Sequence, residues 1–258
     1  MPLLDREREL ELLSEGLERA ATGQGGVALL TGEAGIGKTS LVREFLSNLD
    51  PEFRVLRGAC EDLNVAEPLG PLRDILRDAE PSLVSELSGI ENHLEIYAQV
   101  MSVLANHPDG TVVVIEDMHW ADEATVDFVR FVARRIIDRP IFLMVTSRAE
   151  QAYYRQKVRR AFGDLPMEAL FRIGLAPLSE DAVSELCKNL SRDPKDIYDA
   201  SGGNAFFVTE LLRNAGDDIP PSISDAVLSR VDSLSSHDRA LLEAVSIVPR
   251  RVKPSIWR

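Results

Sequence analysis

Eight consecutive residues, Gly32 to Thr39, follow the pattern G-x-x-x-x-G-K-T, which is typical of loops that bind phosphate groups. Glycines let the backbone turn tightly and direct successive N–H groups toward one anion. The Lys38 ammonium group can reach the β- and γ-phosphates of a nucleotide, and the Thr39 hydroxyl can bind Mg²⁺. The residues expected to contact the nucleotide are Gly32, Glu33, Ala34, Gly35, Ile36, Gly37, Lys38, Thr39 and Ser40.

Two adjacent carboxylates, Glu116 and Asp117, follow the apolar β-branched run at residues 112–115. A phosphate loop requires a metal-binding carboxylate at the end of a neighbouring strand, and a second carboxylate can polarise the attacking water. We therefore expect Thr39, Glu116 and Asp117 to hold Mg²⁺ and the two acids to serve catalysis. The sequence leaves open which acid faces the metal, with Asp117 favoured as the one more sensitive to mutation. The alternative is a pair of acids that only caps the strand end.

A third charged group, Arg148, comes shortly after the apolar run at residues 141–145. The carboxyl ends of neighbouring parallel strands converge on one ligand crevice. We therefore predict that Arg148 contacts the γ-phosphate, distinguishes ATP from ADP and belongs to the catalytic set. The alternative is a surface salt bridge with Glu150 or a neighbouring acid. His119 fits a place in the site and an ordinary loop position equally well.

The elements that must position these groups alternate between apolar runs and helix patterns. Strands are predicted at residues 27–31, 53–57, 112–115, 141–145 and 170–173. Helices are predicted at residues 6–21, 40–49 and 93–105 and after Asp122. This alternation indicates an α/β domain of the P-loop NTPase type, with a three-layer arrangement around a parallel sheet, over residues 1–178.

Only helix patterns follow Ser179, so we place a domain change near Leu178. The patterns lie at about residues 181–190, 194–200, 205–214, 222–233 and 236–247. Cys187 lies among helix-spaced apolar residues in the first of them and is expected to be a buried thiol.

The composition restricts the partners and the cellular setting. The 258 residues carry a net charge of −13, which opposes nonspecific binding to nucleic acid or to an anionic membrane. The basic run at residues 155–160 favours a solvated helix face over a local binding patch. Cys60 and Cys187 lack metal-ligand spacing, and neither a secretory signal nor a membrane-spanning run is found, so we expect a cytoplasmic protein.

Several blocks of the sequence resemble one known family. They lie at residues 4–10, 30–39, 115–122, 146–148, 175–179 and 201–208. The chain resembles the AAA-like nucleotide-binding module of the STAND class of signal-transduction ATPases. It is most similar to the N-terminal ATP-binding region of large LuxR-type transcriptional regulators. The blocks Glu-Asp-Met-His-Trp-Ala-Asp and Gly-Gly-Asn-Ala-Phe-Phe are the most specific.

The resemblance implies an ATP-binding α/β core, a helical lid at residues 179–218 and a winged-helix domain, of which residues 219–258 would be an incomplete start. It also implies slow hydrolysis that acts as a switch in transcription regulation. The family usually has proline at the position of Ala205 and glycine at the position of Asp5. An incomplete winged helix should expose apolar side chains within residues 240–248.

The sequence therefore predicts a module that binds ATP, ADP and Mg²⁺ and hydrolyses ATP slowly to ADP and phosphate. Two alternatives stay open: a nucleotide-binding module without significant hydrolysis, and a P-loop phosphotransferase. The phosphotransferase is disfavoured because residues 179–215 contain only Arg192 and Arg213 to cover phosphates. Besides ATP, the expected partner is a second copy or another protein, bound through the lid and the C-terminal helices. Direct DNA binding and membrane binding are not expected.

Overall fold

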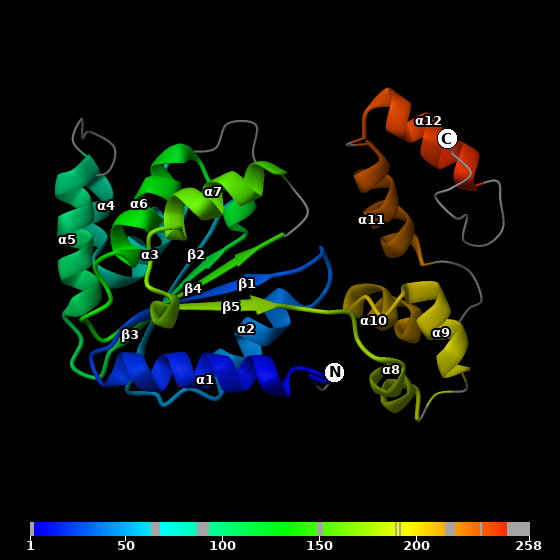
Figure 1. Cartoon of the computed structure of the whole chain (residues 1–258), viewed down its shortest axis with the longest axis horizontal. Helices are drawn as coiled ribbons and strands as arrows, with labels where there is room; N and C mark the ends of the chain where they lie inside the picture. Colours follow the sequence, from blue (N-terminus) through cyan, green and yellow to red (C-terminus); the bar gives the residue numbers. More distant parts are fainter. Residues whose placement is uncertain are drawn as a thin grey trace. The chain divides into compact units, whose positions relative to one another are not determined.

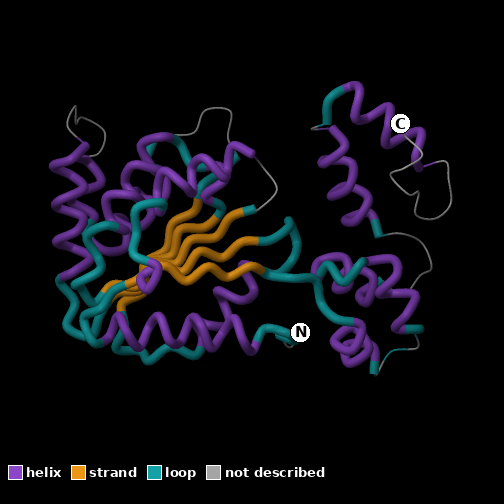
Figure 2. Tube along the Cα trace, in the orientation of Figure 1, coloured by secondary structure: helices purple, strands orange, loops and turns teal. Residues whose placement is uncertain are grey.

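The computed structural model describes residues 3–62, 68–86, 93–148, 152–188, 190, 192–214, 220–232 and 234–246. The chain divides into two compact units, Met1–Ala182 and Val183–Arg258. Figure 1 shows the first unit as a sheet with helices on both sides, and Figure 2 shows its five strands lying side by side.

The sheet of the first unit is entirely parallel. Its strands are β1 Gly26–Thr31, β2 Arg54–Ala59, β3 Thr111–Glu116, β4 Ile141–Ser147 and β5 Leu170–Gly174. Their order across the sheet is β2-β3-β4-β1-β5, and every neighbouring pair runs in the same direction. The strand predictions are confirmed, with small shifts at the ends. The apolar runs of β3 and β4 are buried, as strands covered on both faces must be.

Helices and short turns connect the strands of the first unit. The helices are α1 Glu7–Ala21, α2 Lys38–Ser47, α3 Gly70–Ala79, α4 Pro81–Glu86, α5 His93–Ala105, α6 Glu123–Ala133 and α7 Ala152–Phe162. The 3-10 turns are η1 Met118–Trp120 and η2 Met167–Ala169. The predicted helices correspond to α1, α2, α5 and α6.

The two faces of the sheet carry separate apolar cores because successive strand residues point to opposite sides. On one face, Val112 and Val114 of β3 belong to a cluster with Leu13 of α1 and Leu41 of α2. On the other face, residues such as Ile115 pack into a larger cluster with α3, α5, α6 and α7. The predicted three-layer α/β fold is therefore confirmed. Because the strands are parallel, the carboxyl ends of β1, β3 and β4 lie at the same end of the sheet.

The second unit contains helices in the part that the structure describes. They are α8 Glu180–Cys187, which begins just before the unit boundary, α9 Pro194–Ser201, α10 Ala205–Arg213, α11 Pro221–Asp232 and α12 Ser236–Ser246. The Cys187 thiol is buried, as predicted, together with Val183, Ile197 and Val208.

Helix α12 has no buried residue among those described. Leu241 and Leu242 on it are 44% and 43% exposed, in agreement with the exposed apolar side chains expected there. Residues 247–258 lie outside the described part of the chain, so the winged helix stays a prediction.

Candidate nucleotide-binding site

The phosphate loop connects β1 to α2, as its sequence pattern requires. Gly37 is the residue just before α2 and has a φ of 106°, in the left-handed region that favours glycine. A Cβ atom on Gly32 would lie 2.9 Å from the Ile36 side chain and 3.1 Å from the Leu175 carbonyl oxygen. Glycines at these positions are therefore required by the path of the loop and by its close packing.

Lys38 is the first residue of α2 and is buried beneath the loop. Its ammonium group donates hydrogen bonds of 2.8 Å to the carbonyl oxygens of both Gly32 and Glu33. Because these carbonyls belong to the loop itself, the lysine charge lies within the backbone turn that would surround a phosphate. The helix N-terminus adds a partial positive charge at the same place.

The first acid, Glu116, lies directly against the loop. Its Oε2 atom accepts a hydrogen bond of 3.0 Å from the Thr39 hydroxyl, although β3 and β1 are separated by β4. Its Oε1 atom accepts one of 2.5 Å from a guanidinium nitrogen of Arg57 on β2. The Glu116 side chain is only 14% exposed, and each of its two oxygens accepts a hydrogen bond from a protein group.

The second acid, Asp117, occupies a constrained position at the end of β3. Its φ of 55° and ψ of 43° are left-handed, which is uncommon outside glycine. Its backbone N–H donates a hydrogen bond of 3.0 Å to the Thr146 hydroxyl at the end of β4. Burial raises the pKa of the Asp117 carboxyl. The positive charge of Lys38 partly offsets this rise, the negative charge of Glu116 adds to it, and the positive charge of Arg148 again lowers the pKa.

Beside Asp117 lies a fully buried histidine, His119. Its Nδ1 atom is 3.8 Å from Asp117 Oδ1, and neither ring nitrogen has a hydrogen-bond partner among the described residues. Burial, followed by the charges of Arg148, Lys38 and Lys157, lowers the pKa of His119 to about 4. The imidazole is therefore neutral at ordinary pH and lies beside Asp117, and its role in the site stays a prediction.

Arg148 follows β4 and packs near the same turn. The guanidinium carbon lies 5.7 Å from the centre of the Trp120 ring, whose own centre is 4.9 Å from that of His119. The positive charge of Arg148 acts to lower the pKa of both the Asp117 carboxyl and the His119 imidazole. Glu150, the partner in the alternative interpretation, lies outside the described residues.

One supporting residue of the acidic turn was not predicted. Lys157 of α7 is buried and donates hydrogen bonds to the carbonyl oxygens of His119 and Ala121. The predicted solvated helix face is therefore correct for Arg159 and Arg160, which are exposed, and wrong for Lys157. The apolar pair at 161–162 was the signal that one side of this helix is buried.

The N-terminal block packs against the loop from another side. Arg6 is buried and one of its guanidinium nitrogens donates to the carbonyl oxygens of Ile36, at 3.3 Å, and Ala176, at 2.7 Å. Asp5 has a φ of 56°, which explains why glycine suits this position in the family that the sequence resembles. Aspartate tolerates this conformation, and its carboxylate accepts a hydrogen bond of 2.7 Å from the Ser179 N–H.

The structure thus brings Lys38, Thr39, Glu116, Asp117 and Arg148 to one edge of the first unit. Ala205 belongs to the second unit, where it begins α10 after the cap residue Asn204.

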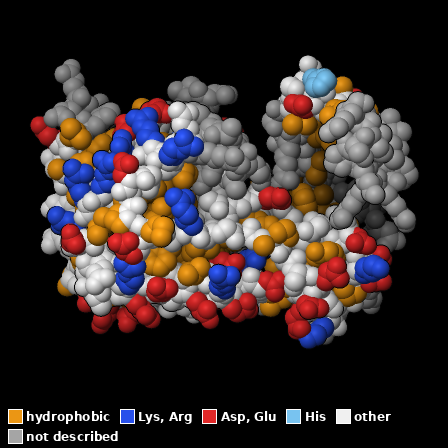
Figure 3. Space-filling view, in the orientation of Figure 1, with side chains coloured by type: hydrophobic (Ala, Val, Ile, Leu, Met, Phe, Trp, Pro, Cys, Tyr) orange, Lys and Arg blue, Asp and Glu red, His pale blue; other side chains and the backbone are white. Residues whose placement is uncertain are grey.

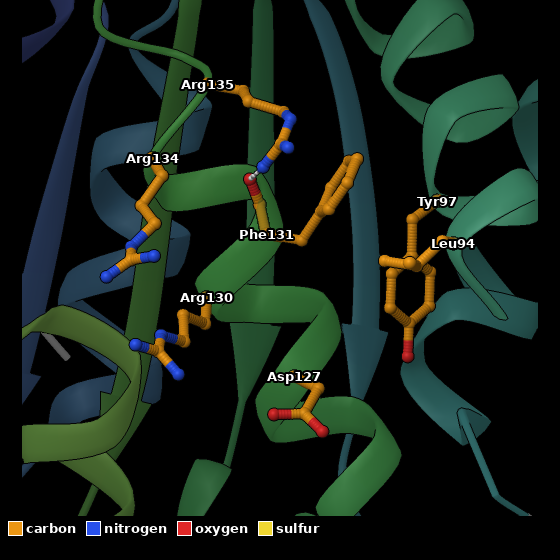
Figure 4. Close-up of a pocket in the computed structure, with 7 residues that line it drawn as sticks. All are labelled: Leu94, Tyr97, Asp127, Arg130, Phe131, Arg134 and Arg135. Atoms are coloured by element: carbon orange, nitrogen blue, oxygen red, sulfur yellow. Dashed lines mark hydrogen bonds between the residues drawn. The ribbon is translucent and has the colours of Figure 1, made fainter.

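A hollow of about 370 Å³ between α5 and α6 is distinct from this site (Figure 4). It is rich in arginine, and Figure 3 shows blue side chains gathered over this region, whereas red side chains line the edge formed by α1. Arg130 and Arg134 both pair with Asp164, and the Arg135 guanidinium lies 3.7 Å from the centre of the Phe131 ring. These charges already have partners within the protein, and the phosphate loop takes no part in the hollow.

Similarity to known proteins agrees with this geometry. The AAA ATPase domain family matches residues 2–145. The chain is also 27% identical, over 277 residues, to an uncharacterized protein of Rhizobium meliloti (strain 1021). That alignment covers 85% of this chain and 26% of the other protein, so the chain spans about a quarter of the length of this relative.

Solved structures with the same fold include nucleotide-bound proteins. A Walker-type ATPase of Pyrococcus abyssi has a TM-score of 0.58 and 16% identity, covering 95% of this chain and 76% of that one. The Aeropyrum pernix ORC2 protein, solved as ADPNP and ADP complexes, has a TM-score of 0.54 and 16% identity, covering 81% and 62%. The Aeropyrum pernix ORC1 protein, solved with DNA, has a TM-score of 0.56 and 17% identity, covering 96% and 73%. At these identities the likeness shows the fold alone.

Among the helices that the structure describes, none is long and apolar enough to cross a membrane. The family match spans more than half of the chain and includes the phosphate loop and both acids. With the parallel sheet and the geometry around Lys38, it shows that the chain belongs to the AAA ATPase domain family and is a nucleotide-binding module of that type.

Proposed function

We propose that this chain is an ATP-dependent conformational switch that hydrolyses ATP slowly to ADP and phosphate. The observation that carries the proposal is the hydrogen bond between the Thr39 hydroxyl and Glu116 Oε2. It joins the phosphate loop to a carboxylate from another strand, and Mg²⁺ bound to a nucleotide requires oxygen ligands of these two kinds.

The residues present fit a magnesium ion that arrives with a nucleotide. Thr39, Glu116 and Asp117 offer only hard oxygen donors, which Mg²⁺ prefers. Among the described residues, no group of three or more His, Cys, Asp or Glu side chains forms a metal site of its own. The ion would therefore depend on the phosphates for part of its shell, and when bound it would neutralise charge on them.

The geometry supports a division of labour between the two acids. Glu116 contacts Thr39, so we assign it to the metal side. Asp117 makes no such contact in the described structure, and its raised pKa suits a group that accepts a proton from the attacking water. The bond from its backbone N–H to the Thr146 hydroxyl holds the backbone of Asp117 at the end of β3.

Hydrolysis would act as a switch because some contacts exist only in the ATP state. We assign Lys38 and Arg148 to the γ-phosphate, so that loss of this group removes both contacts. Differential contacts of this kind are what shift a conformational equilibrium. The helical lid at residues 179–218 is the element that we propose to respond.

The setting of this switch is signal transduction in a transcriptional regulator of the STAND, LuxR-like type. The support is the sequence resemblance, above all the blocks at 115–122 and 201–208. Self-association or a protein partner would use the lid and the C-terminal helices, where Leu228 and Leu241 are exposed. With a net charge of −13, direct DNA binding by this chain is not part of the proposal.

Turnover and product retention together test the proposal. The purified protein would be incubated with ATP and Mg²⁺, phosphate release would be followed, and the bound nucleotide would be identified by mass spectrometry. Slow phosphate release with ADP retained is the expected result. Retained ATP with no phosphate release would favour the alternative of a nucleotide-binding module without hydrolysis.

A further inference from the structure

Arg57 is a charged residue in the site that the proposed roles do not use. It lies on β2, the edge strand, and its guanidinium is 2.5 Å from Glu116 Oε1. Its side chain is 45% exposed, whereas that of Glu116 is 14% exposed. A half-exposed cation therefore contacts the carboxylate that also accepts the hydrogen bond from Thr39.

The contact is built into the register of the sheet. Arg57 lies beside Val114 and Ala59 lies beside Glu116, so the arginine and the glutamate are diagonal neighbours. Val114 belongs to the core on the α1–α2 face, and because side chains alternate, Glu116 points to that same face.

The position of β2 is in turn fixed from the opposite side. A Cβ atom on Gly58 would lie 2.2 Å from the Pro71 carbonyl oxygen, so α3 packs directly on this strand. The backbone of Arg57 is therefore held within a packed strand, and so is that of Glu116.

We propose that Arg57 is a positioning residue that sets how strongly the site holds Mg²⁺, an inference that rests on the proposed nucleotide-binding function. It binds Glu116 Oε1 and leaves Oε2 to face Thr39. Its positive charge offsets the carboxylate charge that would attract the ion. Nucleotide retention, and that of ADP in particular, is thereby made less dependent on Mg²⁺.

Removing Arg57 should have two opposite effects on Mg²⁺ binding, one through the orientation of Glu116 and one through the lost charge. Without Arg57, the glutamate gains rotational freedom, which weakens metal binding by the entropy of one side chain. The site also loses a cation next to a dication, and that repulsion acts at short range in a partly buried place. We expect the second effect to exceed the first, so that removing the arginine tightens Mg²⁺ binding.

The test is calorimetry of ADP binding in Mg²⁺ and in EDTA, without any measure of turnover. For Arg57→Gln, the ratio of the two affinities should grow by about tenfold over wild type. Affinity in EDTA should stay within about twofold, because Arg57 makes no contact with the phosphate loop. Arg57→Lys keeps the charge and should behave as wild type. Arg8→Gln, an exposed arginine on α1, changes the net charge equally and should also behave as wild type.

An unchanged or smaller ratio in Arg57→Gln would overturn the proposal, and so would an Arg57→Lys variant that behaves like Arg57→Gln. If wild type binds no ADP in either buffer, the proposed nucleotide-binding function itself fails, which is a different result from an unchanged ratio.

Discussion

The backbone N–H of Asp117 donates a hydrogen bond of 3.0 Å to the hydroxyl of Thr146. This bond joins the turn after β3 to the last residues of β4, and it helps to hold Asp117 in a left-handed conformation that is uncommon outside glycine. The backbone of Asp117 is thus held by the neighbouring strand, whereas the carboxylate of Glu116 is held by Thr39 and Arg57.

Replacement of Asp117 by asparagine should separate binding from chemistry. The amide keeps the size and the backbone contact of the side chain but cannot accept a proton. We expect ATP affinity within about threefold of wild type and turnover at least about a hundredfold lower. Calorimetry and a phosphate-release assay would measure the two quantities, and an unchanged rate would remove Asp117 from the catalytic set.

Replacement of Arg148 by alanine should change the selectivity for ATP over ADP. If the guanidinium contacts the γ-phosphate, its loss should weaken ATP binding about tenfold more than ADP binding. Arg159→Ala on the exposed side of α7 is a matched control and should affect neither affinity. Equal losses for the two nucleotides would show that Arg148 does not act on the γ-phosphate.

Stability at alkaline pH should depend on Tyr97 of α5. Its ring is buried, its hydroxyl donates a 2.9 Å hydrogen bond to the Ala124 carbonyl oxygen, and burial raises its pKa to about 12. Only the neutral phenol can donate this bond. Between pH 10 and 12, the unfolded chain releases this proton more readily than the folded chain, so the free energy of unfolding falls as pH rises.

The loss assigned to Tyr97 should be about 1–2 kcal/mol over that range and absent in Tyr97→Phe. Urea unfolding at a series of pH values would measure it as the difference between the two proteins. Tyr198→Phe in the second unit serves as the control for the loss of a tyrosine hydroxyl. A Tyr97→Phe slope equal to that of wild type would contradict this account of α5–α6 packing.

Much of the fold could be predicted from the sequence because its signals are local. Runs such as residues 112–115 and 141–145 indicate buried parallel strands by themselves, and the loop pattern at 32–39 fixes the strand–loop–helix connection. The placement of Glu116 and Arg148 at the same end of the sheet could also be predicted, because the carboxyl ends of neighbouring parallel strands lie together.

The supporting residues could not be predicted because they depend on which strands and helices become neighbours. Arg57 reaches Glu116 only because β2 pairs with β3, and no local pattern specifies that pairing. Lys157 is buried because α7 packs on the turn after β3, although the basic run around it has the composition of a solvated surface. Asp5 has a left-handed backbone, which its residue type alone does not reveal.

The most direct test of the nucleotide site is calorimetric titration of ATP, with Mg²⁺, into wild type and into Lys38→Ala. Removing an ammonium group that contacts phosphate should weaken binding by about a hundredfold. Lys195→Ala, an exposed lysine on α9, should bind as wild type does. Folded wild-type protein that releases no heat with ATP, or Lys38→Ala that binds ATP as tightly as wild type, would contradict the account.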